Sequence, residues 1–264
     1  MTATTDKILV DTRDGVGWIT INNPERRNAV SLEMLEAMGA AFDGFAADDD
    51  VRCVVIHGAG DKAFASGADI SQFEKNRSTQ EAADHYAAIS KGVRFKMLDF
   101  EKPLIAMIRG YCMGGGLGLA MTADMRIAAD DAVFAIPAAR LSIAYDAINV
   151  SKLVQLVGPS RAKEILLTAK RYDAAQALAM GLVNEVVPVA ELEAAVADIT
   201  GRLAENAPLS MRASKITIDT LMKDPADRDM ARVEAASKAC FGSDDYKEGR
   251  TAFMEKRKPV FKGR

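Results

Sequence analysis

Short apolar runs rich in β-branched residues alternate with longer amphipathic stretches through the first two-thirds of the chain. The predicted strands are residues 17–22, 51–57, 104–108, 124–128 and 183–187. Between the first two strands lies 31–45, where apolar residues recur at helical spacing and Ser31 stands at the N-cap position. Strands that alternate with helices pair in parallel, because each crossover helix returns the chain to the same end of the sheet. The alternation therefore predicts an α/β fold.

The pattern changes after Pro188, where only amphipathic helical stretches follow. The predicted helices of this part are residues 192–203, 209–222 and 231–240. No Gly/Ser-rich linker separates them from the preceding residues, so one continuous unit with a helical appendage is expected. We place the core at 1–200 and the helical C-terminal region at 201–264. The polar stretch 71–94 is interpreted as a mobile loop followed by a helix over a ligand site.

Composition and charge exclude several classes of protein. Among 264 residues, 34 Lys and Arg stand against 37 Asp and Glu, so the basic excess typical of a nucleic-acid binder is missing. No apolar run reaches the 18 or so residues of a membrane-spanning helix. The three cysteines lie far apart and the chain holds two histidines, so no metal site is expected. The polar N-terminus has no apolar signal-peptide core, and a cytoplasmic location is expected.

Three consecutive glycines form the strongest local motif. Gly114, Gly115 and Gly116 follow a predicted strand and lead into a helix-compatible run. The free N–H groups at the start of such a helix can stabilise a phosphate or a developing oxyanion, although a glycine cluster also occurs where a strand–helix turn simply packs tightly. A Rossmann fingerprint is excluded because Met121 stands where its third glycine belongs, and no Gly-Lys-Ser/Thr completes a P-loop.

A second motif, Ser66-Gly67-Ala68-Asp69, follows another short apolar run. Its backbone N–H groups offer another place where donors can converge. Asp69 by itself is interpreted as a cap or turn residue.

Together these motifs resemble the enoyl-CoA hydratase/isomerase (crotonase) superfamily, over roughly residues 10–261. The matching segments are 22–29 (NNPERRNA), 66–70 (SGADI), 102–106 (KPLIA) with 114–116 (GGG), 181–183 (GLV) and 252–257 (AFMEKR). They occur in the family's order. The resemblance implies a crotonase-like spiral of ββα turns with a helical C-terminal oligomerisation region.

The resemblance also implies an activity and its site. The substrate would be an acyl-CoA thioester, with coenzyme A as part of the substrate and no separate cofactor. The chain would form homotrimers, often paired into hexamers, through helices in 201–264. The backbone N–H groups of Ala68 and Gly115 would form the oxyanion hole. Coenzyme A contacts would come from Arg26, Arg27, Ala29, Ser66, Ala68, Asp69 and Ile70, and from Phe253 and Lys256 reaching a neighbouring subunit's cofactor.

The chain departs from the family pattern at two positions. Hydratases of this family use two glutamates, and the corresponding residues here are Gly118 and Ala138. Hydration requires one carboxylate to activate water and another to protonate the α-carbon. Asp146 and Tyr145 are the groups that could replace them, at offsets where relatives in the superfamily carry an active aspartate or tyrosine.

Asp146 has an alternative role as the cap of a helix beginning near Asn149, or as a partner of Arg140, and the two interpretations are equally open. With Asp146 as the acid/base and Tyr145 as an orienting donor, we expect enoyl-CoA isomerisation or hydration through an enolate. The alternatives are an acyl-CoA decarboxylase, a dehalogenase, or an acyl-CoA-binding homologue without catalysis.

Overall fold

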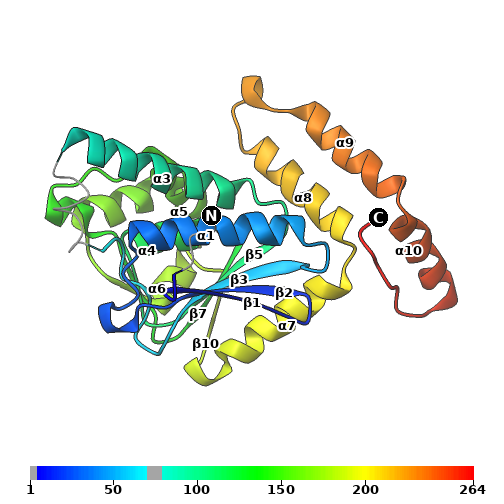
Figure 1. Cartoon of the computed structure of the whole chain (residues 1–264), viewed down its shortest axis with the longest axis horizontal. Helices are drawn as coiled ribbons and strands as arrows, with labels where there is room; N and C mark the ends of the chain where they lie inside the picture. Colours follow the sequence, from blue (N-terminus) through cyan, green and yellow to red (C-terminus); the bar gives the residue numbers. More distant parts are fainter. Residues whose placement is uncertain (1–4, 70–78) are drawn as a thin grey trace.

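The larger sheet contains the first strands of the chain. The computed structural model describes residues 5–69 and 79–264, and Figure 1 shows how its elements are arranged. In spatial order the strands are β1 (Ile8–Arg13), β2 (Val16–Ile21), β3 (Cys53–Gly58), β5 (Leu104–Ile108), β7 (Met125–Ala129) and β10 (Glu185–Val187). β1 and β2 form an antiparallel hairpin, and all later neighbours pair in parallel. The predicted parallel pairing is thereby confirmed.

A smaller sheet accompanies the large one. Its order is β4 (Ala63–Ala65), β6 (Tyr111–Met113), β8 (Val133–Ala135) and β9 (Tyr172–Asp173). β3, β5 and β7 of the large sheet are each followed directly by a strand of the small sheet and then by a helix. Repetition of this ββα unit builds the spiral that the family resemblance implied.

The helices lie on both faces of the large sheet and beyond it (Figure 1). Their bounds are α1 (Leu32–Ala47), α3 (Gln80–Leu98), α4 (Gly115–Thr122), α5 (Ala147–Thr168), α6 (Ala174–Ala179), α7 (Leu192–Glu205), α8 (Pro208–Leu221), α9 (Met230–Phe241) and α10 (Asp244–Glu255). Short 3-10 turns include η1 (Pro24–Arg26) and η3 (Pro137–Leu141). None of the helices in the described ranges combines the length and apolar character that crossing a membrane requires.

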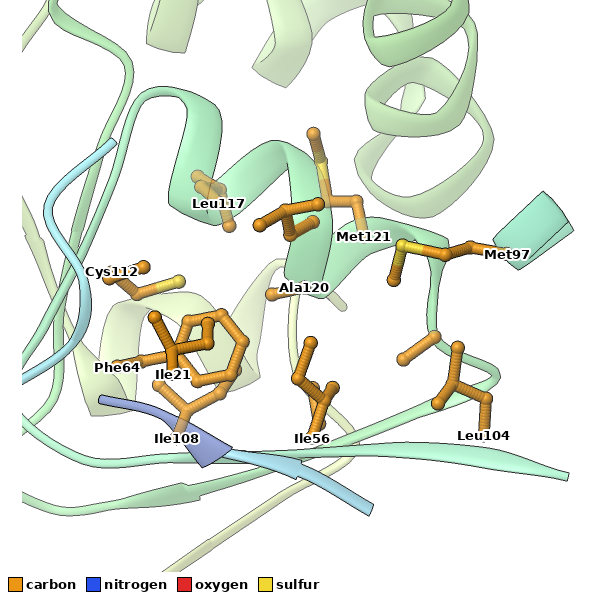
Figure 2. Packing of buried hydrophobic residues seen from close by; sticks show 14 of the residues in the cluster. Ile21, Ile56, Phe64, Met97, Leu104, Ile108, Cys112, Leu117, Ala120 and Met121 are labelled. Carbon is orange, nitrogen blue, oxygen red and sulfur yellow. The ribbon is translucent and has the colours of Figure 1, made fainter. Parts of the chain in front are cut away.

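Two apolar clusters form the core, one on each face of the large sheet. Figure 2 shows the larger cluster, in which strand residues of the large sheet meet the small sheet and helices α3 and α4. Its labelled members include Ile21, Ile56, Phe64, Met97, Cys112 and Leu117. On the other face, Leu192 and Val196 of α7 pack on Cys53 and Val55. A strand such as β3 is therefore buried on both faces at residues 53–56, which explains the apolar run with which it begins.

The sequence patterns located the long elements well and the short ones poorly. The strand predicted at 104–108 coincides with β5, and the helix capped by Ser31 is confirmed as α1, with the Ser31 hydroxyl accepting from Met34 N. Strand β1 was missed because its residues after Ile8 are exposed. The strands β6, β8 and β9 were missed because two or three residues carry no readable alternation. Helix α10 was missed as well.

The C-terminal helices α8, α9 and α10 extend away from the sheets in Figure 1. The predicted division at residue 200 falls inside α7, which packs on the large sheet, and it stays a prediction. In the stretch 71–94, the expected helix is present as part of α3. Residues 70–78, including the predicted loop, lie outside the described residues.

Candidate active site

The three glycines form a sharp turn between β6 and α4. Gly114 has φ 50° and ψ −117°, a backbone conformation that glycine adopts readily and other residues rarely adopt. Its N–H donates to Ala135 O at 2.8 Å. A Cβ added at Gly116 would lie 2.3 Å from Ala65 O, so only glycine lets α4 approach β4 this closely. The turn therefore fixes the start of α4 against the segment that follows β4.

That segment, residues 66–69, pairs with the segment before α1. Val30 N donates to Gly67 O at 2.8 Å, and Asp69 N donates to Val30 O at 2.9 Å. The buried Asn28 side chain supports this pairing, because its Nδ2 donates to Ala63 O at 2.7 Å and to Ala59 O at 3.0 Å. The position of Ala68 is thus set by backbone pairing and by one buried amide.

The two segments bring Ala68 and Gly115 together. A Cβ built on Gly115 would lie 3.4 Å from Ala68 N, and one built on Gly67 would lie 3.4 Å from Gly115 N. Across the described residues, neither amide donates a hydrogen bond. Gly115 is also the first residue of α4, where the helix leaves its N–H groups without partners and carries a partial positive charge. Such a pair of donors can hold one anionic oxygen.

Tyr145 contacts the same turn. Its hydroxyl donates to Gly114 O at 2.9 Å. Burial raises the pKa of Tyr145 well above the ordinary tyrosine value, and the Asp146 carboxylate acts in the same direction while Arg94 opposes it. The side chain is therefore a neutral hydroxyl at physiological pH, with its proton directed at the Gly114 carbonyl.

Asp146 is the N-cap of α5, as one of the two interpretations predicted. Its Oδ1 accepts from the backbone N–H groups of Ile148 and Asn149, both at 3.1 Å. Its Oδ2 accepts from Asn149 Nδ2 at 2.9 Å and from Arg94 Nη1. The helix starts at Ala147 rather than near Asn149. The expected pairing with Arg140 is wrong, because the cation that reaches this carboxylate comes from α3.

Gly118 and Ala138, the two positions expected to correspond to the hydratase glutamates, are enclosed differently. A Cβ on Gly118 would lie 2.8 Å from Asn149 Nδ2 and 3.1 Å from Tyr145 Oη, so these polar groups fill the space above it. Ala138 lies in η3 and is partly buried against the core. The side chains of Asn149, in α5, and of Tyr145, just before α5, thus stand where a side chain at 118 would project.

The residues expected to contact coenzyme A lie mostly near the Ala68 segment. Arg26 Nη1 bonds both carboxylate oxygens of Asp69 at 3.2 Å. The Arg27 guanidinium lies 5.1 Å from the Tyr111 ring centroid. Ser66 Oγ donates to Arg26 O at 3.2 Å. These residues, with buried Ala29, are brought together with Ala68. Ile70 lies outside the described residues.

Phe253 and Lys256 are not brought to this cluster within one chain. Both belong to the end of α10, which Figure 1 places on the opposite side of the molecule from α4. The Phe253 side chain is 83% exposed.

Metal ligands are not grouped in the described ranges: no three His, Cys, Asp or Glu residues there are placed to hold an ion. A cavity of about 250 Å³ opens between α3, α5, α8 and α9, lined by groups such as Phe100, Lys152 and Asp219. It is separate from the Ala68–Gly115 pair, whose residues do not line it.

Three contributors to the site were not assigned a role from the sequence. They are Arg94 and Asn149, which both bond the Asp146 carboxylate, and Asn28, which bonds the Ala63 carbonyl. The partners lie 52, 3 and 35 positions away in the sequence, respectively. Asn28 lies inside a matching motif, which was a usable signal. Arg94 lies in a polar, charged stretch, and nothing in the sequence marked it.

The fold together with the comparisons defines the class of enzyme to which this chain belongs. A family model described as enoyl-CoA hydratase/isomerase matches residues 11–264, and the chain belongs to this family. It acts on acyl-CoA as an enzyme of that superfamily.

Among curated proteins, the chain is 38% identical over 257 residues to crotonyl-CoA hydratase of Syntrophomonas wolfei, covering 97% of this chain and 98% of that protein. It is 34% identical to short-chain-enoyl-CoA hydratase of Clostridium acetobutylicum, covering 96% of both. Among solved structures, an enoyl-CoA hydratase/carnithine racemase from Magnetospirillum magneticum matches with a TM-score of 0.94 and 35% identity, covering 99% of this chain and 97% of that one.

Proposed function

We propose that this enzyme decarboxylates a 2-carboxyacyl-CoA thioester through an enolate. The observation that carries the proposal is the pair of Ala68 and Gly115 amides, which lie close together and donate to no acceptor among the described residues. In the enolate, negative charge moves from carbon 2 onto the thioester oxygen. Two fixed donors at that oxygen stabilise the charge-developing state more than the ground state, which is the requirement for catalysis.

The reaction balances without a protein base. The thioester oxygen accepts from both amides, and the bond between carbon 2 and the free carboxylate breaks. Its electron pair passes to carbon 2 and the thioester oxygen, and carbon dioxide leaves. A water molecule then delivers a proton to carbon 2 as the thioester carbonyl re-forms, and the hydroxide that remains combines with the carbon dioxide to form bicarbonate.

The side chains beside the amides favour this reaction over those that begin with proton abstraction. Positions 118 and 138 carry a glycine and an alanine. Both oxygens of Asp146 already accept two hydrogen bonds each, and the Tyr145 hydroxyl donates to Gly114. A general base must have a free lone pair within reach of the proton that it removes. Within the described ranges, the Tyr145 hydroxyl is used as a donor and the Asp146 oxygens already accept hydrogen bonds, so neither group offers that lone pair in this arrangement.

Enoyl-CoA isomerisation or hydration is the second candidate. It is favoured by the 38% identity to a protein named crotonyl-CoA hydratase. In that reaction Asp146 would be the acid/base, and it would have to release Arg94 or Asn149 to free an oxygen. Thioester binding without turnover is an outcome that the experiment below separates from both reactions.

Coenzyme A would bind beside Ala68, along Arg26, Arg27, Ala29, Ser66, Asp69 and Ile70, as part of the substrate and without a separate cofactor. Phe253 and Lys256 would reach the cofactor of a neighbouring subunit, which agrees with their distance from α4 in Figure 1. Exposed apolar side chains support assembly of a homotrimer or hexamer through these helices; on α8, α9 and α10 they are Ile218, Leu221, Met230, Phe241, Tyr246, Phe253 and Met254.

A substrate panel in deuterated buffer tests the proposal. Malonyl-CoA and methylmalonyl-CoA, labelled with ¹³C in the free carboxylate, are incubated with the protein beside crotonyl-CoA and 3-butenoyl-CoA. We expect labelled bicarbonate and deuterium at carbon 2 of the product, seen by NMR. Water addition or bond migration on the enoyl thioesters, without release of label, would instead establish the second candidate. Binding of every thioester without conversion would mean a non-catalytic homologue.

A further inference from the structure

The Tyr145 hydroxyl and the Gly115 amide act on the same peptide group. Tyr145 donates to the carbonyl oxygen of Gly114 at 2.9 Å, and that carbonyl shares its planar peptide unit with the N–H of Gly115. We propose that Tyr145 is a positioning residue, whose hydroxyl orients and polarises the 114–115 peptide so that Gly115 N–H becomes a stronger oxyanion donor. The proposal rests on the proposed function in one respect, which is that the Gly115 N–H donates to the thioester oxygen.

Polarisation follows from the chemistry of the amide. A hydrogen bond to a peptide carbonyl draws electron density from the nitrogen and makes its N–H a better donor, an effect of about 10–30% per bond in connected chains. The Gly114 carbonyl accepts a second hydrogen bond from Gly118 N at 3.0 Å. Two donors thus act on one side of the peptide whose other side would face the thioester oxygen.

Orientation follows from the backbone. Gly114 is held at φ 50° and ψ −117°, outside the regions that repeat in helices and strands. Rotation about this residue would swing the Gly115 N–H away from Ala68. The Tyr145 hydroxyl fixes the carbonyl end of the peptide and therefore opposes that rotation.

The position of Tyr145 is fixed by the contacts made at the start of α5. Tyr145 directly precedes the N-cap Asp146, and Asp146 is tied to Arg94 of α3 and to Asn149. Burial keeps the Tyr145 proton in place, since it raises the pKa of the hydroxyl. The donor is therefore present across the physiological pH range.

Gly118 makes room for this arrangement. Its missing Cβ would lie 3.1 Å from Tyr145 Oη and 2.8 Å from Asn149 Nδ2. A side chain at 118 would push the hydroxyl off the Gly114 carbonyl. Gly118 and Tyr145 are therefore a matched pair, and changing either should remove the same hydrogen bond.

The test compares Tyr145→Phe, Gly118→Ala and the double variant with the wild-type protein. Tyr172→Phe is the control, because it removes a buried hydroxyl of β9 that has no hydrogen-bond partner in the described structure. The probe is acetyl-CoA labelled with ¹³C at the thioester carbonyl, and free coenzyme A serves as the ligand without a thioester. The readouts are the ¹³C shift of the bound carbonyl, the affinity for each ligand, and turnover.

We expect the bound carbonyl to shift downfield from free acetyl-CoA in the wild type and to return toward the free value in both single variants. Turnover should fall by about tenfold, less than the hundredfold or more for loss of an oxyanion donor. Coenzyme A affinity should stay unchanged, and the double variant should lose no more than either single one. The Tyr172→Phe variant should match the wild type.

An unchanged ¹³C shift in Tyr145→Phe would overturn the proposal, as would additive losses in the double variant or a loss of coenzyme A affinity that indicates general disruption. The ¹³C shift separates this inference from the proposed reaction. A downfield ¹³C shift that depends on Tyr145, in a protein that releases no carbon dioxide, would refute decarboxylation and support the positioning role. Decarboxylation that is unchanged in Tyr145→Phe would support the proposed reaction and refute the positioning role.

Discussion

Arg126 Nε donates a hydrogen bond of 2.8 Å to the carbonyl oxygen of Leu182. The same buried guanidinium donates to Ala123 O at 2.6 Å, just beyond α4, and to Asn184 Oδ1 at 3.3 Å. One side chain of β7 thus bonds acceptors in two separate loops, the one that follows α4 and the one that precedes β10. Because α4 begins with Gly115, Arg126 secures the helix that carries one of the proposed donors.

Replacing Arg126 with Met should therefore lower the free energy of unfolding by about 3 kcal/mol or more, since buried acceptors left without donors cost about 1–3 kcal/mol each. Arg126→Lys should lose less, because an ammonium can still reach some of these acceptors but cannot span them as a fork does. Urea unfolding measures the change. Arg202→Met, at an exposed pair with Asp198, is the control and should stay within about 0.5 kcal/mol of wild type. Equal losses of stability in Arg126→Met and Arg202→Met would refute the role of Arg126.

Asp146→Asn separates a structural role from a catalytic one. Asparagine is as good an N-cap as aspartate, so the start of α5 should persist. The variant loses the pair with Arg94 and an acceptor for Asn149, and we expect a stability loss of about 1–2 kcal/mol. Turnover of the 2-carboxyacyl thioester should stay within about tenfold of wild type.

Complete loss of turnover in a folded Asp146→Asn protein would contradict this expectation and would favour the isomerase or hydratase mechanism. Asp146→Ala is the companion variant, because it also removes the cap. Its further loss of stability, about 1 kcal/mol beyond the asparagine variant, measures the capping contribution by itself.

How much of the fold was predictable depended on element length. The strand at 104–108 and the helix after Ser31 were readable because five to sixteen residues repeat one pattern. The small sheet was not, because β8 and β9 owe their conformation to neighbours brought in from elsewhere in the chain. Pairing across the chain leaves no local signal in segments of two or three residues.

The site divides in the same way. That Ala68 and Gly115 lie close together was expected from the motifs of the family resemblance, and glycines leave a trace wherever the backbone must approach closely, as at Gly116 against Ala65. The role of the two amides as donors stays a prediction. The contact of Arg94 with Asp146 was not found, because it joins residues 52 positions apart on different helices. Charge patterns along a sequence do not reveal which partner a packed helix will present.

The cysteines should differ sharply in reactivity. Cys53 and Cys112 are buried, and burial raises the pKa of both thiols, that of Cys53 to about 12. The thiolate is the reactive form, so neither should react in the native protein, while the partly exposed Cys240 can. A chromogenic disulfide reagent should label at most one thiol before denaturation and three after it. Rapid labelling of native Cys240→Ser would show that a core cysteine is accessible.

His57 should make stability depend on pH. Burial lowers its pKa below the model-peptide value of about 6.5, and Arg13 acts in the same direction, while Gly58 and Glu193 oppose the shift. The ring bonds Thr20 Oγ1 at 2.9 Å through Nε2 and packs edge-on against Trp18. As pH falls through about 6.5, the unfolded chain takes up a proton that the folded chain does not, so the free energy of unfolding decreases.

The expected decrease is at most about 1.4 kcal/mol per pH unit, and it ends once the pH is below the folded-state pKa. His57→Gln keeps a polar partner for Thr20 but cannot titrate. Urea unfolding of both proteins between about pH 8 and 5 gives the difference in stability, from which the carboxylates common to both cancel. That difference should shrink steadily as the wild type loses its advantage on acidification. A constant difference would mean that His57 is protonated in the folded protein as readily as in the unfolded one.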